Sequence, residues 1–194
     1  MPAPEQPRTR QVSMHLPDNE SDYGDDQEHP DEDALDDMGD EALVWQLLLL
    51  INPGDQETAL SQFEAYRDAV EQASDTVPAV WRVKEAIDWR SGFHVDAGDS
   101  ATFIDALNEL ASRWSIDLDW GGDPGDEDFL EAVAIPTLMA TAYDRLREHG
   151  YTLWTWSTDS DAHAGWIGAS RDDEAMRLVA SVLEIELRPG SDPF

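Results

Sequence analysis

Near the C-terminal end of the chain, apolar residues with the alternation of a strand and with the period of a helix occur in close succession. Residues 151–155 are rich in aromatic and β-prone side chains, and a second such run at 164–168 follows the polar loop 157–163. Ser170 is a candidate N-cap for a helix whose apolar residues recur at the spacing of one face, and residues 185–187 predict a short last strand. This part of the chain therefore predicts two antiparallel strands, a helix and a further strand.

Helical periodicity dominates the earlier part of the chain. Residues 41–51 are apolar nearly all round, which indicates a buried helix, and residues 56–72 carry one apolar face. Pro53 and Gly54 separate the two segments and end the first one. The pattern therefore predicts a helical hairpin.

Between this hairpin and the C-terminal strands, helical and extended patterns alternate. Helices are predicted at 79–87, where a strand is the alternative, at 101–113 and at 127–149, and strands are predicted at 89–97 and 116–120. Pro136 should interrupt the last helix, because proline removes a backbone donor. The order of elements predicts an α/β (α+β) layer fold, with a mixed sheet of about five strands covered by helices.

Composition divides the chain near residue 40. Residues 1–39 are rich in Pro, Asp and Glu and poor in β-branched and aromatic residues, so we expect a disordered acidic tail. Residues 40–190 are expected to form one globular α/β domain. Neither a secretory signal nor an apolar run of the roughly 20 residues that a membrane span needs is present, and no cysteine occurs. We therefore expect a soluble, cytoplasmic protein.

The formal net charge of −31 is the most unusual property of the sequence. Residues 1–40 hold 13 acidic residues and two arginines, a net charge of −11, so the rest of the chain carries −20. Such a surface disfavours nucleic acid, whose phosphates require clustered Lys and Arg. It suits a basic protein partner attracted over long range, and equally a solvated surface that maintains solubility.

Two short segments combine imidazole and carboxylate groups. His94 and Asp96 are two residues apart in a predicted strand, and Asp161 and His163 are two apart beside a predicted loop. If the fold brought them together, they would offer four metal ligands. A metal-dependent hydrolase using Asp and His near residues 157–163 is therefore the alternative hypothesis. No P-loop, nucleophile elbow or zinc-protease motif accompanies them, and no cofactor or bound metal is expected.

A calcium loop is a further possibility between Asp117 and Asp128. Asp117, Asp119, Gly121 and Gly122 approximate its spacing, but Pro124 stands where an apolar residue is expected, and the twelfth position is Asp instead of Glu. An ordinary strand followed by an acidic loop is the favoured interpretation.

Eight tryptophans occur in 194 residues, and most should lie in the core because aromatic side chains bury large areas. Some could instead form a partly exposed patch beside acidic residues, which would suit a protein interface. The candidate binding surface consists of Trp154, Trp156, Trp166, Asp159, Asp161, His163, His94 and Asp96.

The pieces AIDWRSGFHVDAGDS and LREHGYTLWTWSTDSDAHAGWIG, with the closing helix, resemble a bacterial family known only as a domain of unknown function, over roughly residues 42–188. The resemblance implies no activity and no catalytic residues. In acidity and tryptophan content the chain is also similar to bacterial immunity proteins that neutralise basic toxins. The favoured hypothesis is a non-enzymatic binding or regulatory module that acts through protein–protein contacts, with an immunity-type inhibitor as one form of it.

Overall fold

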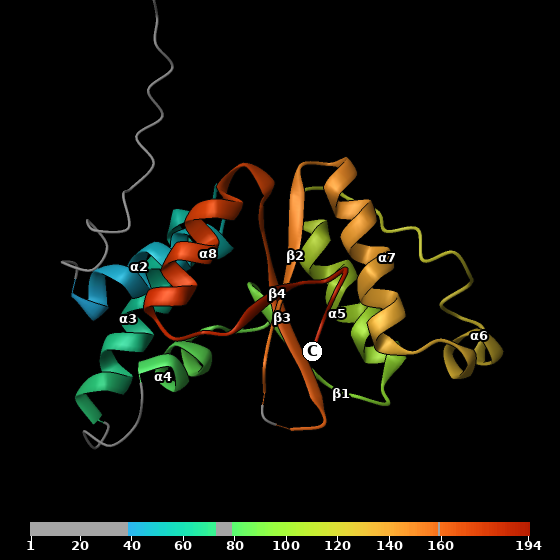
Figure 1. Cartoon of the computed structure of the whole chain (residues 1–194), viewed down its shortest axis with the longest axis horizontal. Coiled ribbons are helices and arrows are strands. Elements are labelled where there is room, and N and C mark those ends of the chain that lie inside the picture. Colours follow the sequence, from blue (N-terminus) through green and yellow to red (C-terminus); the bar gives the residue numbers. More distant parts are fainter. Residues whose placement is uncertain (1–38, 73–78, 159) are drawn as a thin grey trace, which may run out of the picture.

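The computed structural model describes residues 39–72, 79–158 and 160–194, except for the side chains of residues 79–82. The tail predicted for residues 1–39 lies outside this range apart from Gly39. Within it, a four-stranded sheet stands between two layers of helices (Figure 1). Helices α2, α3, α4 and α8 lie on one side of the sheet, and α5 and α7 on the other.

The helices are α2 (Asp40–Ile51), α3 (Gln56–Gln72), α4 (Ala79–Ala86), α5 (Ser100–Ser112), α6 (Glu127–Ala132), α7 (Ile135–Glu148) and α8 (Asp173–Val182), with a 3₁₀ turn η1 (Ser170–Asp172) before α8. The strands are β1 (Gly92–Asp96), β2 (Tyr151–Trp156), β3 (Ala162–Ala169) and β4 (Leu187–Pro189). The strand order is β1-β3-β2-β4, and every described pair is antiparallel.

The register of β2 and β3 divides the core into two clusters. Trp154 pairs with Trp166, and both side chains are buried against α2 and α8. Leu153 pairs with Ile167 on the opposite face, where both pack with α5 and α7. Because successive side chains in a strand alternate between faces, one sheet supplies both clusters.

The predicted α+β class is confirmed, and so are the hairpin of α2 and α3 and the choice of a helix for α4. The break near Pro136 is also confirmed. α6 ends before it, and Pro136 lies in the first turn of α7, where a missing backbone donor costs nothing.

The sheet itself differs from the prediction, because it has four antiparallel strands instead of a mixed set of about five. The predicted strand at 116–120 is wrong. Ile116 and Trp120 are buried against α5 and α7, although this segment pairs with no strand of the described chain. The alternation of apolar and polar residues therefore reflects burial and not a strand. The last strand begins at Leu187 instead of residue 185. Glu184 has a φ of 56°, and the backbone amide of Ile185 still bonds to Ala180 across the end of α8.

Candidate functional site

The two His–Asp segments lie side by side but face opposite ways. Val95 pairs with His163 in the ladder between β1 and β3, so the side chain of His163 lies on the face of α5 and α7. His94 and Asp96 project from the other face of the sheet and are exposed. Among the residues that the structure describes, no group of three or more His, Asp or Glu side chains could hold a metal ion. The described parts of the two segments thus do not converge.

The loop between β2 and β3 contains the rest of the predicted acidic cluster. Asp159 lies outside the described residues. Asp161 is exposed, and its carbonyl oxygen accepts a hydrogen bond of 2.9 Å from the backbone amide of Ala97. Burial lowers the pKa of the His163 imidazole, which lies in a hollow of ≈ 370 Å³ at this end of the sheet.

Of the three tryptophans predicted at the surface, only Trp156 reaches it. Trp154 and Trp166 are each 1% exposed and contribute to the core. Trp156 is half-buried, with the Lys84 ammonium 4.0 Å above the centre of its ring and the His94 ring 6.4 Å away. This cluster of Lys84, His94 and Trp156 joins α4 to strands β1 and β2 across one face of the sheet.

A groove of ≈ 830 Å³ begins at this cluster and follows strand β1. Its lining includes residues on both faces of β1. Gly92 and His94 lie on the face toward α4, and Phe93 and Val95 lie on the face toward α5. Helix α4 contributes one wall and helix α5 the other. The edge of β1 therefore forms the floor of the groove.

The direction of each backbone group in β1 follows from one bond. The backbone amide of Ala97 bonds to Asp161 opposite it, which identifies Ala97 as a residue whose backbone faces β3. Hydrogen-bonded and non-hydrogen-bonded pairs alternate in an antiparallel ladder. The backbone groups of Gly92, His94 and Asp96 therefore point away from β3 and into the groove.

Two of these six outward backbone groups are already bonded within the chain. The amide of Gly92 donates to the carbonyl of Asp88, and the carbonyl of Asp96 accepts from the amide of Asp99, both at 3.0 Å. No hydrogen bond to another described residue uses the amide and carbonyl of His94, the carbonyl of Gly92 or the amide of Asp96. The floor of the groove thus presents two donors and two acceptors.

The rim of the groove is acidic. Glu85 on α4 and Asp105 and Glu109 on α5 are exposed, and within the described part of the chain none of the three takes part in an ion pair. Asp88, by contrast, is paired with Arg90 at 3.3 Å. Trp89, at the mouth of the groove, is 66% exposed and is one of the two large apolar side chains most exposed among the described residues.

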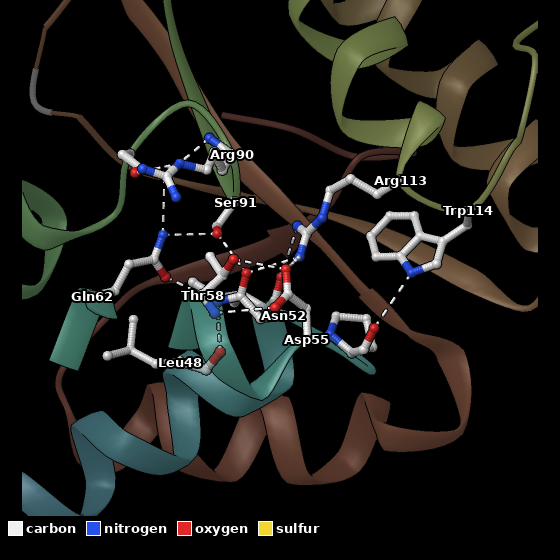
Figure 2. Close-up of polar contacts among 12 residues, drawn as sticks. Leu48, Asn52, Asp55, Thr58, Gln62, Arg90, Ser91, Arg113 and Trp114 are labelled. Atoms are coloured by element: carbon white, nitrogen blue, oxygen red, sulfur yellow. Dashed lines mark hydrogen bonds and ion pairs between the residues drawn. The ribbon is translucent and has the colours of Figure 1, made fainter. Parts of the chain in front are cut away.

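A buried polar network holds the start of β1 in place (Figure 2). Ser91, directly before β1, donates from its hydroxyl to the side-chain carbonyl of Asn52 at 2.5 Å and accepts from Gln62 at 2.8 Å. Asn52 also donates to Gln62 at 2.9 Å and accepts from Arg113 at 2.8 Å. The network joins the α2–α3 hairpin to the end of α5, so the two helix layers are fixed relative to β1.

Electrostatics around this network indicates a structural role. Burial lowers the pKa of the Arg113 guanidinium, and the nearby carboxylates of Asp55 and Asp88 act in the opposite direction. Hydrogen bonds from Thr58 lower the pKa of Asp55 itself. Because the buried side chains of Asn52 and Gln62 already have partners within the chain, the network offers little to a ligand.

Sequence reasoning did not single out the groove residues Glu85, Trp89, Asp105 and Glu109. The helix spacing does place Asp105 and Glu109 on one face of α5. The sequence does not reveal that β1 is an edge strand, because this position depends on the pairing of β3 with both β1 and β2.

Comparison with known proteins gives one match. No curated protein and no solved structure matches the chain. Nothing found supports the similarity to immunity proteins. No helix in the described residues combines the length and the apolar character needed to cross a bilayer. The model of one family, the Domain of unknown function (DUF6630), matches residues 43–190, in agreement with the resemblance noted from the sequence. The chain therefore belongs to the DUF6630 family.

Proposed function

We propose that this protein is a non-enzymatic binding module that holds a basic protein partner in the groove along β1. The observation that carries the proposal is an edge strand with open backbone groups, on the floor of a groove rimmed by carboxylates without ion-pair partners in the described chain. A groove of ≈ 830 Å³ is within the size range of specific ligand sites.

Charge supports a basic partner. Asp105 and Glu109 concentrate negative charge on one wall, and the whole chain carries −31. Fields of this kind raise the association rate of an oppositely charged protein and suppress contact with acidic ones. An aromatic residue as exposed as Trp89, beside an acidic rim, suits a partner rich in arginine.

The test compares two charge-reversed variants that change net charge equally. Asp105→Lys with Glu109→Lys alters the groove, whereas Glu64→Lys with Asp68→Lys alters an exposed pair at the same spacing on α3, outside the groove. Each immobilised protein captures partners from a native lysate at low and high salt, and each captured protein is then purified and titrated directly.

We expect basic proteins to bind the parent and the α3 variant, to bind the groove variant at least about tenfold more weakly, and to dissociate as the Debye length falls to about 3 Å at 1 M salt. Equal weakening by both variants would show that only net charge matters. Unchanged binding by the groove variant would place the interface elsewhere. Either result rejects the proposal.

A further inference from the structure

We infer that the partner binds by strand addition: an extended segment with alternating basic and apolar residues pairs with the open edge of β1 as a fifth strand. The inference rests on the proposed function and specifies its binding mode. Main-chain hydrogen bonds give such complexes their affinity, and the walls beside the strand select alternate side chains.

The backbone of β1 can support this pairing. The open amide and carbonyl of His94 lie between the open carbonyl of Gly92 and the open amide of Asp96. An added strand in either direction can therefore form four main-chain hydrogen bonds with β1. All of them involve every second residue of the partner, because the backbone groups of a strand alternate between its two edges.

The opposite edge of the sheet is closed to such pairing. β4 has three residues. The amide of Gly190 bonds to Leu153 of β2 at 2.8 Å, so the backbone groups of Arg188, two residues earlier, also point toward β2. The outward-facing Pro189 has no amide to donate, and proline on an edge strand is a common protection against added strands. β1 has no proline, so it is the edge of the described sheet that can accept a strand.

The two walls of the groove select different side chains. The α5 wall presents Asp105 and Glu109, with no Lys, Arg or His among its lining residues. Side chains of the added strand that point toward α5 should therefore be lysine or arginine.

The α4 wall is close to neutral. Lys84 and Glu85 are adjacent in sequence, Asp88 is paired with Arg90, and the apolar surface comes from Ile87 and Trp156. Side chains that point toward α4 should therefore be apolar. The two walls together fit a segment with a period of two, basic then apolar.

Charge also excludes occupants that belong to this chain. Residues 1–40 carry a net charge of −11, and a second copy would bring a further −31 to a groove rimmed by carboxylates. Like charges placed together cost several kcal/mol. The N-terminal segment and a second molecule are thus disfavoured, and a basic segment of another protein is favoured.

The probe for the test is a dye-labelled ten-residue peptide of alternating arginine and valine, titrated by fluorescence anisotropy against the full chain. One series of peptides is N-methylated on the valine amides and another on the arginine amides. In an antiparallel complex the peptide residue opposite His94 has its side chain on the same face as His94, toward the α4 wall, and is therefore a valine. The amides of the valines then bond to β1. In a parallel complex the arginine amides do so.

We expect one series to bind about tenfold or more weakly than the parent peptide and the other series to change about threefold or less, because several hydrogen bonds are lost in only one of them. Equal effects in the two series overturn strand addition.

Two variants of the protein complete the test. His94→Pro removes an open amide that β3 does not use, and His94→Thr keeps that amide while removing the same imidazole. We expect about tenfold weaker binding for the proline variant and about threefold or less change for the threonine variant, with circular dichroism confirming that both fold. Equal binding by both variants overturns the inference.

The charge-reversed variant separates the two proposals. If Asp105→Lys with Glu109→Lys abolishes peptide binding while His94→Pro leaves it unchanged, strand addition is wrong and the acidic groove stands. If the charge-reversed variant binds the peptide as the parent does, the proposed function fails as well.

Discussion

Replacement of Asn52 by alanine should be among the most damaging single changes in this protein. The Asn52 side chain is 1% exposed and makes four hydrogen bonds. Its amide donates to Leu48 and Gln62, and its oxygen accepts from Ser91 and Arg113, at distances between 2.5 and 2.9 Å. Truncation leaves several buried groups without their partner, and each such group costs about 1–3 kcal/mol.

The group of Arg113 adds less to this cost than the others, because its side chain is 18% exposed and keeps a contact with Asp55 at 4.0 Å. We therefore expect Asn52→Ala to lower the free energy of unfolding by about 3–5 kcal/mol. Ser91→Ala is the matched control in the same network. After that change Asn52 still accepts from Arg113, and Gln62 still donates to Asp88 at 3.1 Å, so the expected loss is about 1 kcal/mol.

Equilibrium unfolding in urea, followed by tryptophan fluorescence and by circular dichroism, measures both variants. Coincident transitions and an unchanged slope justify a two-state comparison. A loss below about 1 kcal/mol for Asn52→Ala would refute the reasoning, since it would mean that solvent replaces the buried bonds at little cost. Equal losses for the two variants would also refute it, since the four bonds of Asn52 would then matter no more than those of Ser91.

Further predictions concern pH, packing and the chain boundary. Burial lowers the pKa of His163, so the unfolded chain binds a proton at this residue more readily than the folded chain as pH falls below about 6.5. The parent should therefore lose stability between about pH 7 and 5.5, and His163→Gln should lose less, as measured by urea midpoints at the two pH values. A Cβ at Gly165 would collide with a carbonyl oxygen of β2, so Gly165→Ala should lower stability by at least about 1–3 kcal/mol in thermal unfolding, and an unchanged melting temperature would contradict this. Leu183→Ala should cost about 2–5 kcal/mol and half-buried Leu178→Ala less, so the reverse order would show that the packing of α8 is misjudged. A chain that begins at Gly39 should melt within about 4 °C of the full chain, because the preceding residues have little apolar surface to bury, and a larger drop would show that they stabilise the domain.

Local periodicity predicted the helices well. The prediction of 56–72 coincides with α3, and 41–51 differs from α2 by one residue, because the spacing of apolar side chains on a helix is set within a few turns. Strand pairing is a long-range outcome. The alternation at 116–120 resembles a strand as closely as that at 151–155, and only the latter found partners.

The candidate site depended on register, which the sequence did not reveal. The pairing of Val95 with His163 puts His163 and His94 on opposite faces, and a slip of one residue would have put them on the same face. The buried network was equally hidden, since Asn52 and Ser91 are 39 residues apart. Polar residues of these types are usually exposed, so composition alone gives no reason to bury them.

An open edge strand is a liability in a soluble protein, because its free backbone groups can pair with another copy of the same chain. β4 avoids this hazard by its short length and by Pro189, whereas β1 keeps its edge open on the floor of a groove. The net charge of −31 offers another protection, since two copies repel each other before their edges can meet. The same charge attracts a basic chain. In the proposed binding mode, acidity leaves the β1 edge open to a basic foreign strand while it discourages pairing between copies.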